Sequence, residues 1–422
     1  MEKLIYPNGL RVLLVPIEGA LSASVGIWVE AGSRYEDPAK QGISHFVEHM
    51  VFKGTELRTS RQLSEEMDLL GGGMNAYTTK EYTRFYAQTL MENARPAMEL
   101  LTDMLMNSRM AADAVEVERG VILEEMSMYE DVGEDLAHEA LCAAIWPGSP
   151  LGRPITGTRE TVESITSRDL LQYLHGAYTP ERMIAVIAGG FDRDDMLDCM
   201  QTTLGTLSRG NGVPSFDHPA FTPTLALRDK TFEQVNLEVA VPGIPYGGTA
   251  SDGRDLRYPM MLLNFIIGGG SSSRLFVRLR EELGLAYSVY SNHYAAKGAG
   301  LFTVAAGVSP SRQLQVLEEI REILGGVAYG VTEEEFLRAK AQVKSSYILG
   351  LETVAAQASY AGRNELLEGR SVSAAEVLKE LDTLTPADVG GLADHLLRGV
   401  PWALSVAGPL ERESAYQTFI TK

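Results

Sequence analysis

Cysteine is scarce in this sequence, with two residues among 422, at positions 142 and 199. Two cysteines cannot form the disulfide framework of a small secreted protein, so we expect the cytoplasm, with an organelle matrix after processing as the alternative. The sequence also lacks any run of about 18 apolar residues, so we expect no membrane-spanning helix and no membrane partner. The N-terminus lacks the basic region, apolar region and cleavage site of a secretory signal.

Basic residues are outnumbered by acidic ones. Lys and Arg total 37 against 56 Asp and Glu, which gives a formal net charge of −19. Because binding to nucleic-acid phosphates depends on Lys and Arg, this composition argues against a nucleic-acid partner. Hydrophobic residues make up 45% and charged residues 22% of the chain, as in an ordinary globular protein. The length predicts two or three domains.

A weak internal repeat divides the chain. The segments SITSRDL (164–170) and TLTPADV (383–389) each place Thr three residues before Asp, a pattern that begins helices. The segments IAGG (187–190) and VAGP (406–409) follow them as the ends of apolar strands. Each second copy lies 219 positions after the first. The repeat predicts two duplicated halves.

Between the halves lies a stretch rich in Gly, Pro and polar residues, 209–224, which we interpret as a linker between halves at 1–208 and 225–422. Strand-like and helical patterns are mixed within each half. The sequence therefore predicts an α+β fold, with a mixed, mostly antiparallel sheet covered by helices in each half. The expected strands are 10–18, 22–32, 182–190, 235–243, 299–308 and 402–408, and the expected helices include 60–71, 92–108 and 331–352.

Residues 42–55, GISHFVEHMVFKGT, have the pattern of a helix that carries chemistry. At about 100° per residue, one face is apolar and must pack on a core: Ile43, Phe46, Val47, Met50 and Val51. His45, Glu48 and His49 lie on the opposite face. Two imidazoles one turn apart can share a zinc ion, and Glu48 is placed to take a proton from water. The alternative is an ordinary solvated face.

A catalytic zinc site needs a third protein ligand, and residues 114–131 supply candidates. On a helical projection the apolar residues of this segment form one broad arc: Val115, Val117, Val121, Ile122, Met126, Met128 and Tyr129. Glu118 and Glu125 fall near the middle of the arc, where a carboxylate is costly unless it is paired or bound to metal. Glu124 lies at the edge of the arc and is less suited. The alternative is that these acids extend to solvent.

The segments HFVEH and ERGVILEEM (118–126) together resemble the pitrilysin/insulinase family of zinc peptidases, the inverzincins. The likeness covers essentially the whole chain and is strongest to the short-chain branch, which includes mitochondrial processing peptidase and its bacterial relatives. The resemblance implies a zinc metalloendopeptidase in which His45, His49 and Glu125 bind Zn²⁺. It also implies that Glu118 supports a ligand and that Glu48 is the general base.

Two further segments resemble parts of this family. GGGMNAYT, which ends at residue 78, matches in part a family segment beside an edge strand that pairs with extended peptides, so Asn75 and Ala76 are candidate contacts to the substrate backbone. In the second half, Arg280 and Tyr287 match an Arg–Tyr pair that stabilises the oxyanion. Arg278 and Tyr290 are the alternatives for this role.

The second half lacks a zinc site of its own. A shift of 219 brings residues without ligand chemistry to the four zinc-site positions: Asn264, Ile267, Gly268 and Lys344. Because one chain carries both the zinc-type half and the Arg–Tyr half, we expect a homodimer with sites completed across subunits, acting on peptides. A heterodimer with an inactive partner is the alternative.

A second alternative concerns the function itself. The fold also serves non-catalytic subunits of larger assemblies, so the chain is alternatively a non-catalytic or partner-dependent subunit of a heterodimeric peptidase or assembly. Glu48 argues for the enzyme, because a scaffold or a zinc-binding module without turnover has no need for an acid that binds no metal.

Overall fold

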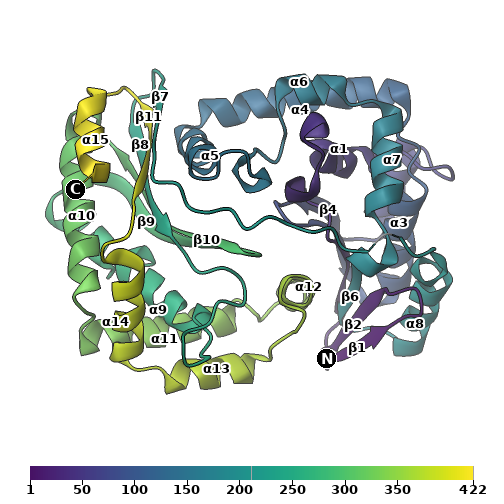
Figure 1. Cartoon of the computed structure of the whole chain (residues 1–422). Helices are drawn as coiled ribbons and strands as arrows, with labels where there is room; N and C mark the ends of the chain where they lie inside the picture. Colours follow the sequence, from purple (N-terminus) through teal and green to yellow (C-terminus); the bar gives the residue numbers. More distant parts are fainter. Residues whose placement is uncertain (211, 422) are drawn as a thin grey trace. The chain divides into compact units, whose positions relative to one another are not determined.

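The computed structural model describes residues 1–210 and 212–421 and divides the chain into two compact units. The first unit contains residues 1–126, 153–216 and 350–371, and the second contains 127–152, 217–349 and 372–422. Each unit has a sheet with helices on both faces (Figure 1). This arrangement confirms the α+β fold expected from the sequence. In the described residues no helix has the length and hydropathy needed to cross a membrane.

The first unit is built on a six-stranded sheet with the order β1-β2-β6-β3-β5-β4. All neighbouring strands are antiparallel except β2 and β6, which are parallel. Its strands are β1 (Glu2–Ile5), β2 (Arg11–Pro16), β3 (Ser22–Val29), β4 (Gly73–Thr78), β5 (Thr83–Leu90) and β6 (Met183–Gly189). Its helices are α1 (Ile43–Met50), α2 (Ser60–Leu69), α3 (Ala94–Met106), α4 (Ala112–Asp131, with its last turn in the second unit), α6 (Arg159–Ser164), α7 (Ser167–Ala177), α8 (Arg193–Thr202) and α12 (Val354–Glu368).

The second unit has a five-stranded sheet with the order β7-β11-β8-β10-β9, and β7 and β11 are its one parallel pair. Its strands are β7 (Leu225–Asp229), β8 (Val235–Pro242), β9 (Ala286–Ala296), β10 (Ala299–Val308) and β11 (Ala403–Gly408). Its helices are α5 (Gly133–Ile145), α9 (Arg257–Gly268), α10 (Gln313–Ala328), α11 (Glu333–Leu349), α13 (Ala374–Thr383), α14 (Pro386–Leu397) and α15 (Glu413–Thr421).

The two sheets repeat one topology, as the internal repeat predicts. From β2 onward the first sheet has the same strand order as the second, with the parallel pair in the same place. The helix starts that revealed the repeat form equivalent caps, in which Thr166 pairs with Asp169 before α7 and Thr385 pairs with Asp388 before α14. Their exchanged side-chain and backbone hydrogen bonds satisfy amide groups that the first helical turn leaves free.

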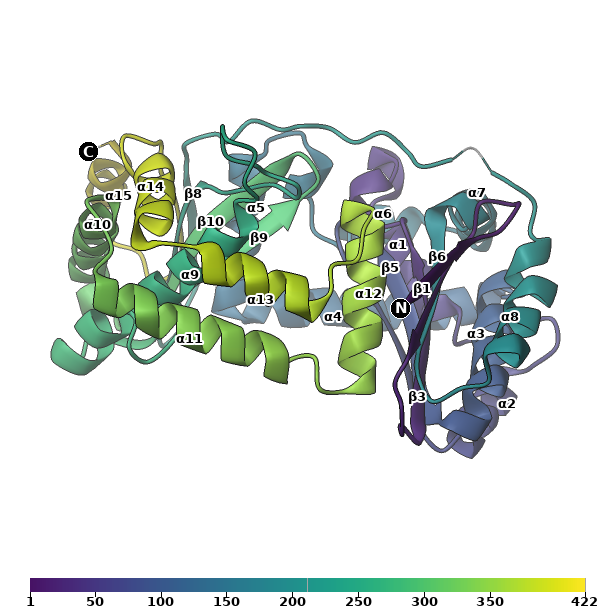
Figure 2. The same cartoon turned by 90° about the horizontal axis from the view of Figure 1, so that it is seen from below.

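The compact units differ from the halves expected at 1–208 and 225–422. Residues 212–224 contain no helix or strand, in keeping with the expected linker, but one segment of each half belongs to the other unit. Helix α12 lies on the face of the first sheet opposite α3 and α8 (Figure 2). There Gly362 lies against the Trp28 indole, which a Cβ at this position would approach to 2.6 Å.

Helix α5 covers a face of the second sheet in the same way, with His138 Nδ1 lying 3.0 Å from Glu238 Oε1 on β8. The exchanged segments occupy matching places in the two halves, because 127–152 shifted by 219 positions falls on 346–371. A helix belongs to the unit whose sheet buries its apolar face. The order of segments along the chain did not predict the exchange of these two segments.

Candidate metal centre

Helix α1 holds the two motif histidines. It begins after Gly42, whose φ of 88° places it in the left-handed region that favours glycine. The apolar face expected from the sequence is buried, with exposures of 3% or less at Ile43, Phe46, Val47, Met50 and Val51. This packing leaves His45 and His49 on the other face, with ring centroids 4.6 Å apart. The helix ends at Met50, before the end of the expected segment 42–55.

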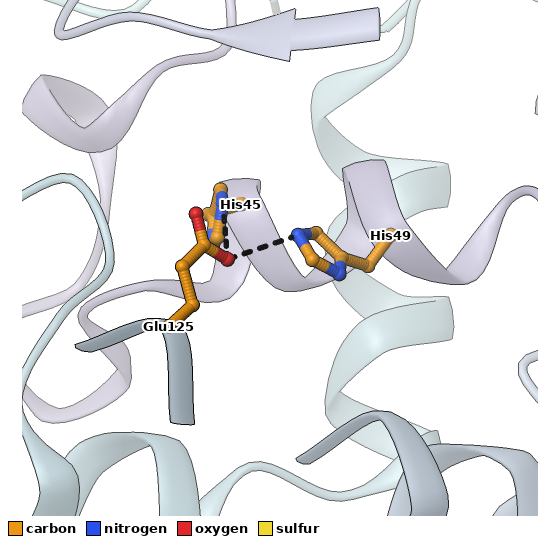
Figure 3. A group of neighbouring side chains, drawn as sticks. All are labelled: His45, His49 and Glu125. Atoms are coloured by element: carbon orange, nitrogen blue, oxygen red, sulfur yellow. Dashed lines mark ion pairs between the residues drawn. The ribbon is translucent and has the colours of Figure 1, made fainter. Parts of the chain in front are cut away.

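Glu125 approaches both rings from α4. One carboxylate oxygen, Oε2, lies 3.7 Å from His45 Nε2 and 3.5 Å from His49 Nε2, and Figure 3 shows the three side chains converging. Two donors bound at about 2.0–2.1 Å to a tetrahedral zinc ion are about 3.4 Å apart. The ligand atoms of all three residues lie within 4.8 Å of one another. The donor set and its spacing therefore fit a zinc ion.

The electrostatic environment favours imidazole in its neutral, metal-binding form. Burial, with a smaller effect from neighbouring His49, lowers the pKa of His45 to about 3. His45 therefore stays neutral at physiological pH, as metal binding requires. Its other ring nitrogen, Nδ1, is buried and has no hydrogen-bond partner within the described residues.

His49 has a supporting carboxylate. Its Nδ1 lies 2.9 Å from Oε1 of Glu118, which is 4% exposed, and Lys53 Nζ lies 2.7 Å from the other oxygen. A carboxylate in this position fixes the ring so that Nε2 faces a metal. The sequence pointed to Glu118 but not to Lys53. Lys53 could have been found from its position about one helical turn after His49, which places the two side chains on the same face.

Glu48 lies beside the group without joining it. Its Oε2 accepts a hydrogen bond of 2.6 Å from the hydroxyl of Thr78, the last residue of β4. Burial raises the pKa of Glu48, whereas the hydrogen bonds from Thr78 and the charge of His49 lower it. Sequence reasoning missed Thr78, although it belongs to the segment that drew attention to Asn75.

The broad apolar arc expected on α4 is wrong in part. Val117 is 70% exposed, Val121 48%, Met128 65% and Tyr129 41%, whereas Val115 and Ile122 are buried with Glu118. The helix packs along one narrow stripe, and a projection cannot show which of its apolar residues meet a neighbour. Glu118 and Glu125 lie on the packed stripe, and Glu124 is exposed.

Asn75 and Ala76 lie on β4, one of the two edge strands of the first sheet. Asn75 is exposed, and its Oδ1 accepts a 2.8 Å hydrogen bond from the backbone amide of Ala76. An edge strand has backbone groups free to pair with another chain.

Arg280 and Tyr287 come together in the second unit. Arg280 donates a 2.8 Å hydrogen bond to the carbonyl of Tyr287, and its guanidinium lies 5.6 Å from the Tyr287 ring centre. Tyr287 is 74% exposed. The alternatives have other partners, because Arg278 pairs with Glu319 and the Tyr290 hydroxyl donates to Glu134.

Across residues 1–210 and 212–421, the group of His45, His49 and Glu125 is the one cluster of three such side chains with metal-ligand spacing. In the second unit α9 follows β7 and β8, as α1 follows the equivalent strands β2 and β3 in the first unit. The residues of α9 include no His, Asp, Glu or Cys. That the second half has no zinc site of its own stays a prediction.

Two family models match consecutive parts of the chain. Residues 11–159 match the model of the insulinase family (peptidase family M16), and residues 164–343 match that of the peptidase M16 inactive domain. An uncharacterized zinc protease of Bacillus subtilis, YmxG, is 36% identical over 95% of this chain and 97% of its own. One from Mycobacterium leprae is 37% identical, over 96% of this chain and 90% of its own.

Solved structures share the fold. A peptidase M16 inactive domain from Pseudomonas fluorescens has a TM-score of 0.89 at 19% identity, covering 97% of this chain and 98% of its own. A chain of complex III2 from Candida albicans has a TM-score of 0.84 at 20% identity, covering 99% of each chain. With relatives named zinc proteases matched along nearly their full length, the chain belongs to the insulinase family of peptidases, family M16.

Proposed function

We propose that the chain is a zinc metalloendopeptidase that hydrolyses extended peptides or unfolded polypeptide segments. The observation that carries the proposal is the approach of Glu125 Oε2 to within 3.5 Å and 3.7 Å of the two imidazole Nε2 atoms. An acid that is not a ligand, Glu48, lies beside them. Relatives named zinc proteases support both the metal and the reaction class.

In this proposal His45, His49 and Glu125 hold the zinc ion, and Glu118 fixes the ring of His49. When bound, zinc supplies a Lewis acid that polarises the scissile carbonyl and acidifies a water molecule. Glu48 takes the proton from that water and passes it to the leaving amine. Its partly buried carboxylate suits both roles, because burial raises the pKa of Glu48 toward the working range of a general acid–base group.

The edge strand β4 supplies a route for substrate binding. A peptide that adds to this edge forms main-chain hydrogen bonds, so affinity does not depend on one particular side chain. Asn75 and Ala76 are the proposed contacts to the peptide backbone. For Ala76, the substrate must replace the hydrogen bond that its amide now makes to Asn75 Oδ1. This mode selects extended segments over folded proteins.

Arg280 and Tyr287 are proposed to donate to the developing oxyanion and to substrate carbonyls. The exposed ring of Tyr287 is accessible to such a partner. A homodimer, in which the second half of one subunit serves the zinc-type half of the other, is the simplest assembly for a chain that carries both halves. A heterodimer with an inactive partner is the alternative.

The alternative function is that of a non-catalytic or partner-dependent subunit. The likeness to a chain of complex III2 extends to the fold alone and gives no catalytic role. The two functions differ in one measurable property, which is cleavage by the purified chain.

The test is incubation of the purified chain with a mixed peptide library, with and without a metal chelator, and mapping of the cut sites by mass spectrometry. We expect cleavage that the chelator abolishes and that added zinc restores. Glu48→Gln should retain zinc and lose cleavage, whereas Glu124→Gln, an exposed acid of α4, should match the wild type. Absence of chelator-sensitive cleavage by the chain alone would favour the partner-dependent subunit.

A further inference from the structure

A short line of hydroxyl groups leads from Glu48 into the sheet. Thr78 Oγ1 lies 2.6 Å from Oε2 of Glu48 and 3.2 Å from Oγ1 of Thr83, the residue paired with it on β5. Thr83 Oγ1 in turn donates a 2.7 Å hydrogen bond to the carbonyl of Ala31, and Thr83 is fully buried. The Thr78 hydroxyl therefore contacts Glu48 on one side and the buried Thr83 of the neighbouring strand on the other.

The two threonines are stiff supports. A β-branched side chain on a strand has few accessible χ1 rotamers, so its hydroxyl points in a defined direction. Thr78 and Thr83 form a directly opposed cross-strand pair on β4 and β5. In such a pair the Cβ atoms are about 4.5–5.5 Å apart, which brings two Thr hydroxyls within reach of each other. The carboxylate of Glu48 thus hydrogen-bonds to a group with little freedom to move.

The duplicated half provides an internal comparison. Asn75 pairs with Tyr86 in the first sheet, and Asn292 pairs with Thr303 in the second, each residue 217 positions further along. At this offset the segment NAYT, which ends at Thr78, corresponds to NHYA, which ends at Ala295.

The half that lacks a zinc site therefore keeps the asparagine and the tyrosine and replaces the threonine by alanine. Glu48 falls on Phe265 at this offset and on Ile267 at the offset of 219, both apolar residues of α9, so the hydroxyl and its acid are absent together. If Thr78 served only the stability of the edge strand, the threonine would have no reason to be absent from the half that also lacks the acid.

We propose that Thr78 is a positioning residue for peptide hydrolysis, whose hydroxyl fixes the orientation of the Glu48 carboxylate, with Thr83 holding Thr78 in place. The proposal rests on the proposed function of Glu48 as general base. Fixed orientation matters because a base must be within hydrogen-bond reach of the proton it removes, and small misplacements reduce the rate steeply.

The hydrogen atoms of the two hydroxyls suit this role. Thr83 gives its hydrogen to Ala31, so toward Thr78 it can only accept. The hydrogen of Thr78 is free for the Glu48 carboxylate. When Glu48 has received a proton from water on its other carboxylate oxygen, Oε2 can still accept the hydrogen bond from Thr78. The hydroxyl line stays hydrogen-bonded before and after the proton moves.

Thr78 also belongs to the strand on which the peptide is proposed to add. A substrate that pairs with β4 therefore binds the same strand that orients the base. Because the hydroxyl contacts Glu48, whereas Asn75 and Ala76 are the proposed contacts to the peptide backbone, its loss should reduce kcat far more than it changes KM.

The experiment compares the variants Thr78→Val, Thr78→Ser and Thr89→Val in the full chain. Valine keeps the shape and the β-branch and removes the hydroxyl, whereas serine keeps the hydroxyl. Thr89 is the matched control, because it is a buried threonine at the other end of β5 from Thr83 and its hydroxyl also donates a 2.6 Å hydrogen bond, to the carbonyl of Leu70. Measurements are kcat, KM, zinc content and a crystal structure of each variant.

For Thr78→Val we expect kcat to fall about 10- to 100-fold, the effect of losing a hydrogen bond to a charged group, with KM and zinc content close to wild type. Thr78→Ser should restore most of the rate, and Thr89→Val should retain it. The crystal structure of Thr78→Val should show the Glu48 carboxylate turned from its wild-type orientation.

The proposal is overturned if Thr78→Val keeps kcat within about twofold of wild type, if serine fails to restore the rate, or if Glu48 keeps its orientation without the hydroxyl. These outcomes are separate from failure of the proposed function. A wild-type chain without chelator-sensitive cleavage removes the role of Glu48, and the crystal structures then decide the positioning on their own.

Discussion

Lys53 Nζ lies 2.7 Å from Oε2 of Glu118, whose other oxygen faces Nδ1 of His49. The buried carboxylate is thus paired on both sides, which offsets the cost of removing it from water. The same pairing orients the imidazole. Glu118, which is not a ligand in the proposed site, therefore sets the orientation of one ligand, His49.

Replacing Glu118 should weaken zinc binding without removing a ligand. We expect Glu118→Gln to lower zinc affinity about 10- to 100-fold, the usual effect of losing a carboxylate that supports a metal-bound histidine. Competition with a chelating dye measures the affinity. Glu124→Gln on the exposed face of the same helix is the control, and equal affinity of Glu118→Gln and wild type would contradict the assigned role.

Substitutions at two glycines should have opposite effects on stability. Gly42 has a φ of 88°, and a Cβ there would lie 2.3 Å from the carbonyl oxygen of Thr156, so Gly42→Ala should destabilise the start of α1 by about 3 kcal/mol or more. Gly120 lies within α4 with open space around it, so Gly120→Ala should stabilise the chain by about 0.5–1 kcal/mol. Urea denaturation measures both, and a neutral Gly42→Ala would refute the packing described.

A pH dependence should arise from Glu36, which accepts hydrogen bonds from the backbone amides of Gly42 and Ser44 at the start of α1. Burial raises the pKa of Glu36 to about 7 from an ordinary value of 4.5, against the effect of these hydrogen bonds. Between these values the unfolded chain releases a proton that the folded chain keeps. The contribution of Glu36 to the free energy of unfolding is therefore complete below about pH 4.5 and falls as the pH rises to about 7, by up to about 3 kcal/mol.

The variant Glu36→Gln cannot titrate, so its free energy of unfolding should fall less than that of wild type across this pH window. Denaturation curves at pH 5 and pH 8 give the comparison for the metal-free chain. An identical change in the two proteins would show that Glu36 is ionised in the folded state throughout the range.

The second half should contribute to turnover and not to metal binding. We expect Tyr287→Phe to lower kcat about 100- to 1000-fold, as for the loss of one oxyanion donor, with unchanged zinc content. Tyr329→Phe is a suitable control, because Tyr329 is an exposed tyrosine of the same unit, at 83%. A Tyr287→Phe variant with full activity would leave the exposed hydroxyl without a catalytic role.

The sequence predicted the parts of the site that depend on local periodicity. The apolar face of α1 follows from a spacing of 3.6 residues, and its burial fixes the opposite face, where His45 and His49 lie. Glu118 and Glu125 stood out because carboxylates among apolar residues need partners. Both interpretations used neighbours along one helix.

The missed features depend on contacts between segments far apart in the chain. In the sequence Lys53 and Thr78 cannot be told from other polar residues, because their partners Glu118 and Glu48 come close to them only in the folded chain. Periodicity did not predict the short edge strand β4, since its glycine and polar residues give no apolar alternation, and only the family resemblance pointed to an edge strand at this segment. The exchange of α5 and α12 between units could not be seen for the same reason, because periodicity shows that a helix has a buried face but not which sheet covers it.

The most direct test of the account is anomalous diffraction at the zinc absorption edge from crystals of the full chain. We expect one strong peak about 2.0–2.2 Å from Nε2 of His45, Nε2 of His49 and a carboxylate oxygen of Glu125. Zinc-loaded crystals with no peak among these three side chains, or with a peak that Glu125 does not reach, would contradict the proposed metal centre.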